Sequence, residues 1–169
     1  MLGILSVLLL MAVVQIGASL PVFRGDGGMR VLASQMTTAR ELAMAERRYM
    51  RVAFTPSNLL QIIREEVPGP ATTVVKSVVF ESGVQYSLVN GLPDTPDAFG
   101  KSTAVSFGIV TAVKFSPDGT LVNQDGSSVN GTVFLAIPGS TLSARAVTVL
   151  GSTGRIRAYR WDGRQWKLV

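Results

Sequence analysis

The chain of 169 residues contains no histidine and no cysteine. Without cysteine it can form neither a disulfide framework nor a thiol nucleophile. Without histidine it lacks the most common metal ligand and the most common general acid or base at neutral pH, and a Ser-His-Asp triad is excluded. A Ser-Lys pair stays open. We expect a protein that is not an enzyme, with no catalytic, cofactor-binding or metal-binding residues and no small-molecule substrate.

Charge is also missing from the first stretch of the chain, because residues 1–23 contain no charged side chain. A helix of about 20 apolar residues is long enough to cross a bilayer core of ~30 Å. Apolar side chains fall on every side of this stretch, which predicts a helix buried in a membrane or among neighbouring helices. The candidate membrane and assembly residues in this stretch are Leu2, Ile4, Leu5, Leu8, Leu9, Met11 and Val13.

Two alternatives for residues 1–23 stay open. A cleaved secretory signal would need a basic region before its apolar core, and nothing precedes Leu2 except Met1. A helix buried in a soluble core would need later apolar stretches long enough to surround it, and the sequence contains none. We therefore favour a helix that is embedded in the membrane or buried in a bundle.

The remaining length fits one domain, because about 120 to 145 residues can bury a core large enough to fold alone. Pro21 and three glycines within residues 24–28 predict an interruption of the helix, or a hinge. We accordingly divide the chain into a transmembrane and assembly helix (1–23), a hinge (24–28) and a globular domain (29–169).

Within the domain, residues 29–50 repeat apolar side chains at three- and four-residue spacing, which predicts an amphipathic helix. Its predicted apolar stripe comprises Val31, Leu32, Met36, Ala39, Leu42, Ala43 and Met50. The period then changes to two, which predicts strands at residues 49–55, 59–65, 74–80, 85–89, 104–107, 112–116, 132–137, 146–150, 155–161 and 166–169. The fold class is α+β: a long N-terminal helix, apolar in its first half and amphipathic in its second, packed on an antiparallel β-sheet domain.

Turn signals separate these strands. The Asp118-Gly119 and Asp162-Gly163 pairs predict hairpin turns, and residues 90–103 and 123–131 predict longer surface loops. We expect Trp161 and Trp166, which flank the second turn, to form a cross-strand pair, with a subunit or DNA contact as the alternative. The loop carboxylates, which we expect to serve turn geometry and not a metal site, are Asp94, Asp97, Asp118 and Asp125.

The C-terminal residues 145–169 carry a net charge of +5, equal to that of the whole chain, with six basic residues against Asp162 alone. In an extended strand Arg155 and Arg157 lie on one face about 7 Å apart, which matches the spacing of phosphates in nucleic acid. Tyr159 and Trp161 share that face and could stack on a base. The alternative is a solvated basic strand that protects a sheet edge. The candidate nucleic-acid contacts are Arg155, Arg157, Arg160, Arg164 and Lys167.

Three stretches resemble the type IV pilin and pseudopilin superfamily, and most of all its minor pseudopilins of the GspH/FimT kind. Residues 2–9 (LGILSVLL) resemble part of the signature helix, and residues 39–48 (ARELAMAERR) resemble the end of that helix. Residues 115–119 (FSPDG) and 154–157 (GRIR) resemble a hairpin and the terminal strand of the family. The order and spacing of these stretches carry the resemblance.

One feature departs from the family pattern. The family begins with a basic leader, a glycine cleavage site and a Phe-Thr-Leu-x-Glu start, and none of these is present before or after Met1. Met1 therefore matches a position several residues inside the mature helix, so that leader cleavage and N-methylation cannot be assigned to a position. Arg24 and Arg30 follow the apolar stretch, so the positive-inside rule alone would keep the domain in the cytoplasm. A missing basic leader would account for both oddities.

The resemblance implies a structural minor pilin or pseudopilin of a type IV pilus or a type II secretion pseudopilus, assembled through its N-terminal helix. Its expected partners are other pilin or pseudopilin subunits and the inner membrane, with the globular domain on the periplasmic or extracellular side. The alternative is a DNA-binding minor pilin used in DNA uptake, because some DNA-uptake pilins of the family bind DNA through a similar Gly-Arg-x-Arg strand.

Overall fold

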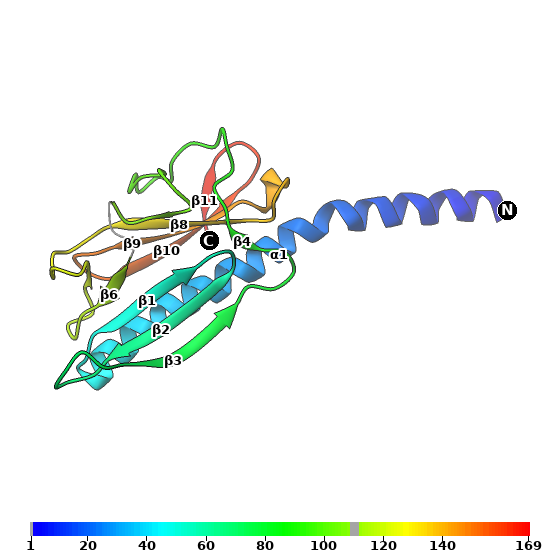
Figure 1. Cartoon of the computed structure of the whole chain (residues 1–169). Helices are drawn as coiled ribbons and strands as arrows, with labels where there is room; N and C mark the ends of the chain where they lie inside the picture. Colours follow the sequence, from blue (N-terminus) through cyan, green and yellow to red (C-terminus); the bar gives the residue numbers. More distant parts are fainter. Residues whose placement is uncertain (1, 109–111) are drawn as a thin grey trace.

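The computed structural model describes the backbone of residues 2–108 and 112–169, and the side chains of residues 20–108 and 112–169. One helix, α1 (Leu2–Glu46), opens the chain. Its N-terminal half projects away from the rest of the protein, and its C-terminal half lies against two β-sheets (Figure 1). The predicted α+β class, a long helix packed on antiparallel sheet, is confirmed.

The C-terminal half of α1 packs because its apolar side chains recur on one face. Met29, Leu32, Met36 and Ala39 are all at most 1% exposed, and Ala43 continues the stripe. Val31, which the sequence placed in this stripe, is 37% exposed and lies outside it. The helix ends at Glu46, four residues earlier than predicted, because Arg47 adopts a left-handed conformation with φ of 51°.

The first sheet has five strands in the order β3-β2-β1-β6-β7. All of its neighbouring strands are antiparallel. β3 is an outer strand that pairs only with β2, and its register shifts at Ile62 and Ile63 of β2. The strands are β1 (Met50–Thr55), β2 (Leu59–Glu65), β3 (Thr72–Val79), β6 (Val113–Phe115) and β7 (Leu121–Val122).

The second sheet has the order β11-β10-β9-β8-β4, and β5 also pairs with β8. Its central strands β8 and β9 are almost fully buried, while the β10–β11 hairpin ends the chain. A short 3-10 helix, η1 (Thr141–Ser143), connects β8 to β9. The strands are β4 (Gln85–Tyr86), β5 (Val105–Ser106), β8 (Gly131–Ala136), β9 (Arg145–Leu150), β10 (Arg155–Trp161) and β11 (Trp166–Leu168).

Every predicted strand region contains an observed strand, and the ends differ by a few residues. β7 and η1 were not predicted, because two or three residues show no period unless the flanking sequence continues it. The main core lies between α1 and the two sheets, and a second cluster lies under the β10–β11 hairpin. There Trp161 and Trp166 form the predicted cross-strand pair, with ring centroids 5.4 Å apart and both side chains buried.

The predicted interruption at residues 24–28 is wrong, because α1 continues through Pro21 and through all three glycines. Two of the glycines are sites of close packing. A Cβ at Gly25 would lie 2.6 Å from the carbonyl oxygen of Ser143, and one at Gly28 would lie 2.7 Å from Cγ1 of Val84. The domain thus presses against this part of the helix and holds it in shape.

The predicted membrane and assembly residues, Leu2 to Val13, lie outside the described side chains, so their burial stays a prediction. Among the residues that the structure does describe, no helix combines the length and the apolar character needed to cross a membrane.

We expect Gly28→Ala to destabilise the full chain by about 1 kcal/mol or more, because the new methyl group meets Val84 and forces the packing to shift. Gly27→Ala is the matched control. Nothing lies within 4 Å of a Cβ at Gly27, so this change should stabilise the chain by about 0.5 to 1 kcal/mol through helix propensity. Urea unfolding followed by circular dichroism would measure the stability of both variants. A Gly28→Ala variant that is as stable as the unmodified chain would contradict the packing described here.

Candidate functional site

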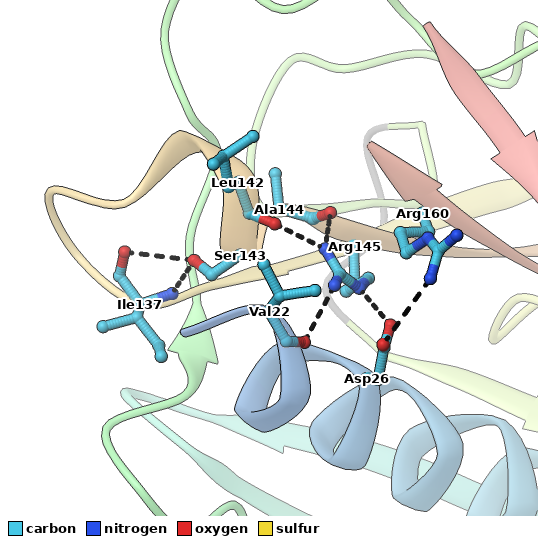
Figure 2. A network of polar contacts seen from close by, with 8 residues as sticks. All are labelled: Val22, Asp26, Ile137, Leu142, Ser143, Ala144, Arg145 and Arg160. Atoms are coloured by element: carbon cyan, nitrogen blue, oxygen red, sulfur yellow. Dashed lines mark hydrogen bonds and ion pairs between the residues drawn. The ribbon is translucent and has the colours of Figure 1, made fainter. Parts of the chain in front are cut away.

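The most unusual side chain in the structure is Arg145, the first residue of β9, which is 0% exposed. Its Nε donates to Oδ1 of Asp26 at 2.7 Å, and its Nη2 donates to the carbonyl oxygen of Val22 at 2.9 Å. Its Nη1 donates to the carbonyl oxygens of Leu142 and Ala144 at 2.9 and 2.8 Å. One guanidinium therefore joins α1 to the segment that leads into β9 (Figure 2).

Burial penalises the charged guanidinium and lowers the pKa of Arg145 below its ordinary value, while Asp26 opposes that shift. A buried cation is tolerated only when it is paired and its donors are satisfied. Asp26 supplies the counter-charge and is itself only 18% exposed in its side chain. Arg160, which is 45% exposed, approaches the other oxygen of Asp26 at 3.9 Å and adds a weaker contact.

The backbone around η1 is held by a second set of contacts. The buried hydroxyl of Ser143 accepts from the backbone nitrogen of Ile137 at 2.9 Å (Figure 2). It donates to the carbonyl oxygen of Ser140 at 2.6 Å. These bonds hold the backbone of residues 142–144 in place. The carbonyl oxygens of Leu142 and Ala144 accept hydrogen bonds from Arg145, and that of Ser143 lies close to Gly25. We call the set formed by Val22, Gly25, Asp26, Ser143 and Arg145 the helix junction.

The sequence analysis counted Arg145 in the basic tail and did not single it out. The signal was nevertheless present, because Arg145 opens a strand of apolar and small residues, and Asp26 is the first acidic residue of the chain. Pairing them needs knowledge that these two positions, 119 residues apart, meet in space.

Asp97 forms a second, half-buried polar site. Its carboxylate accepts hydrogen bonds from Oγ1 of Thr148 at 2.6 Å, from the hydroxyl of Tyr159 at 2.9 Å and from Nη1 of Arg157 at 2.6 Å. Burial raises the pKa of Asp97, but the three hydrogen bonds together hold it below its ordinary value. Asp97 therefore fastens the loop between β4 and β5 to β9 and β10, which is more than the predicted turn role.

The other three loop carboxylates do serve their turns. Asp94 accepts from the backbone nitrogens of Thr95 and Gly100, and Asp125 accepts from that of Ser127. Asp118 accepts from the hydroxyl of Ser116 and from the backbone nitrogen and hydroxyl of Thr120, and these hydrogen bonds lower its pKa to about 2. Within the described ranges, no three carboxylates, histidines or cysteines gather into a group that could hold a metal ion.

The basic residues of the C-terminal hairpin do not gather on one face. Arg155 and Arg157 lie on one face of β10, while Arg160 lies on the other, directly opposite Lys167 of β11. Three of them already contact carboxylates: Arg157 meets Asp97, Arg160 meets Asp26, and Lys167 meets Asp162 at 2.8 Å. Arg155 and Arg164 are exposed.

Two sequence interpretations of β10 are wrong. Tyr159 is 3% and Trp161 is 8% exposed, so neither ring is available to stack on a base or to make the alternative contact proposed for Trp161. The loop that carries Asp97 covers the face on which they lie. The alternative of an edge-protecting strand also fails for β10, because β10 lies between β9 and β11. Lys167, by contrast, does lie on the outer strand β11.

Comparisons with known proteins show the fold. Two crystal forms of the type IV minor pilin FimU from Pseudomonas aeruginosa are similar to this chain, at 15% and 16% sequence identity and with TM-scores of 0.55 and 0.52. The first match covers 84% of this chain and 91% of FimU, and the second covers 79% and 90%. No family model matches the sequence. No curated protein sequence matches it either. The chain has the type IV pilin fold.

We expect Asp26→Asn to destabilise the full chain by about 3 kcal/mol, because it leaves the buried guanidinium of Arg145 without a counter-charge. Arg160→Gln is the matched control, since it removes only the long, exposed contact to the same carboxylate and should cost about 0.5 kcal/mol or less. Chemical denaturation of both variants tests this. A loss in Asp26→Asn no larger than that in the control would show that the helix junction does not hold the fold.

The Asp97 site predicts a dependence of stability on pH. Because its folded pKa is depressed, the contribution of Asp97 is fully present above about pH 5 and is lost as the pH falls through the folded pKa. At neutral pH we expect Asp97→Asn to lower the free energy of unfolding by about 2 kcal/mol. The difference from the unmodified chain should shrink in acid, as unfolding curves between neutral pH and the acid range would show. A difference that stays constant with pH would contradict the assignment.

Proposed function

We propose, from the fold shared with type IV minor pilins, that this chain is a structural subunit of a pilus-like filament and assembles through the N-terminal half of α1. The observation that carries the proposal is the form of α1. Its N-terminal half projects from the domain (Figure 1), and residues 2–23 contain no charged side chain. An uncharged helix of that length gains stability only where other apolar surface or lipid removes it from water.

Burial of these side chains is favourable enough to keep the helix out of water, in lipid before assembly and among other helices after it. Fully burying one leucine, isoleucine, valine or methionine side chain contributes about 1.5 to 3 kcal/mol, and such residues dominate positions 2–19. We infer that the partners are other pilin or pseudopilin subunits and, before assembly, the inner membrane. The globular domain would then lie on the periplasmic or extracellular side. A type IV pilus and a type II secretion pseudopilus are both compatible with this role.

The helix junction supports the same proposal. A subunit that assembles through a projecting helix must hold that helix at a fixed angle to its domain, so that each domain takes a defined place on the filament surface. Arg145 binds α1 at Val22 and Asp26, where the helix leaves the sheets. We therefore propose that residues 1–23 form the assembly helix and residues 29–169 the domain, with residues 24–28 as a rigid connection instead of a hinge.

Catalysis forms no part of the proposal, because the fold is that of structural subunits and the chain lacks histidine and cysteine. The alternative of DNA capture by Arg155, Arg157, Arg160, Arg164 and Lys167 stays a prediction of the sequence. No contact in the structure favours it, since three of these five cations already bind carboxylates.

The test of the proposal is a charge placed in the assembly helix. We expect Leu9→Arg to remove the tagged full chain from sheared filament fractions of its host, because an arginine in an apolar helix bundle or bilayer centre costs about 2.5 to 3.5 kcal/mol. Val67→Arg, which alters an exposed valine of the domain, should leave incorporation unchanged. Immunoblots of the filament and membrane fractions give the readout. Normal incorporation of Leu9→Arg would overturn the proposed assembly mode.

A further inference from the structure

A groove of about 580 Å³ lies between α1 and the outer strand β3. Phe23, Gly27 and Val31 of α1 form one wall, and Val78 and Val79 of β3 form the other. Phe23 is 69% exposed, Val79 is 55% exposed and Val31 is 37% exposed. Several large apolar side chains that face one exposed groove indicate a binding surface, because isolated subunits rarely leave such patches uncovered.

The wall on α1 has a notch. Phe23, Gly27 and Val31 follow one another at four-residue spacing, so they lie in a row on one face of the helix. Gly27 is exposed, and a Cβ added there would have nothing within 4 Å. A glycine inside a helix costs about 1 kcal/mol relative to alanine. Gly25 and Gly28 are explained by contacts with Ser143 and Val84, but no contact within the described chain explains Gly27.

A notch between two large apolar residues allows another backbone to approach closely, and helices use glycine in this way to pack against each other. An acyl chain of a lipid would not require it, because a flexible chain can follow a surface with or without one extra methyl group. The notch therefore favours a helix as the occupant of the groove.

We propose that the groove receives the N-terminal half of α1 from a second copy of this chain, an inference that rests on the proposed function. That half, residues 2–19, is uncharged and suits the apolar residues of the groove, which is also lined by the exposed Arg24 and Glu81. At ~1.5 Å per residue it is about 27 Å long, against about 12 Å for the row from Phe23 to Val31, so it can lie along the whole groove.

The groove is also continuous with the segment that needs burial. Leu20 and Phe23, which directly follow residues 2–19 in the sequence, are both exposed, and Phe23 belongs to the groove. A contact in which the helix of one copy enters the groove of the next is head-to-tail. Such a contact does not pair two copies by a twofold axis, and it builds an open helical filament where the rotation between subunits does not close a ring.

Disulfide cross-linking in membranes can test the groove, because the chain has no cysteine of its own. Two differently tagged full-length copies are co-expressed, one with Val79→Cys in the groove and the other with Leu5→Cys, Leu9→Cys or Val13→Cys in the projecting helix. We expect a cross-link between Val79→Cys and at least one helix position. Val67→Cys, at a valine that lies outside the groove and is 68% exposed against 55% for Val79, is the control and should form none.

A second variant tests the notch. Gly27→Leu should lower the yield of the groove cross-link by about tenfold, which corresponds to ~1.4 kcal/mol, without unfolding the domain, because Gly27 is exposed and a Cβ there would have nothing within 4 Å. Equal yields from Val79→Cys and Val67→Cys, or a yield that Gly27→Leu leaves unchanged, would overturn the inference. A disulfide between two Val79→Cys copies in place of the groove cross-link would also overturn it, since it would mean that the β3 edges pair.

A further cross-link separates this inference from the proposed function. Two copies that both carry Leu9→Cys report whether the projecting helices associate at all. A Leu9 to Leu9 cross-link without a groove cross-link would overturn the groove and leave assembly through the helix in place. The absence of both cross-links in the membrane would overturn both.

Discussion

The geometry of this protein depends on one buried guanidinium. Arg145 donates to a carboxylate and a carbonyl oxygen on α1 and to two carbonyl oxygens at the start of β9, so a single side chain fixes the angle between the helix and the second sheet. The planar group of arginine offers five donors in a rigid fork, which a lysine could not reproduce. A buried ion pair often adds little net stability compared with apolar residues of the same size. Here the ion pair fixes the orientation of α1 on the second sheet, because the donors of Arg145 are satisfied only when the helix and the sheet meet in one arrangement.

The same contact orients the surface that we propose for assembly. Val22 and Asp26 face Arg145. Phe23 is the residue after Val22, and Gly27 is the residue after Asp26. One residue corresponds to about 100° of rotation around the helix, so Phe23 and Gly27 lie on an adjacent face. Once Arg145 holds the first face against β9, the second must face the edge of β3, where the groove lies. The contact that fixes α1 on β9 therefore also sets which face of α1 lines the groove beside β3, without any movement of the domain.

Local pattern was enough to predict the elements but not their long-range contacts. The stripe from Leu32 to Ala43 and the alternation in β1, β2 and β10 were visible because each reflects one buried face of one element. The split into two sheets was not, since it depends on which strands pair across the chain. The face shared by Arg155, Arg157, Tyr159 and Trp161 was predicted correctly, but the exposure of Tyr159 and Trp161 was not. A distant loop covers that face through Asp97, and no periodicity in β10 records what a loop 60 residues away will do.

The glycines of α1 show why composition alone led to a wrong prediction. The sequence does not distinguish Gly25, Gly27 and Gly28, and together with Pro21 they predicted a break in the helix. In the fold, Gly25 admits the carbonyl of Ser143 and Gly28 admits Val84, so both are required by contacts inside the subunit. Gly27 has no such neighbour, although it costs the helix as much as the others. Because no contact within the described part of the subunit offsets the lower helix propensity of Gly27, we infer that the offsetting contact forms only when a second subunit is present. Gly27 thus connects the helix that must be buried to the surface that can bury it.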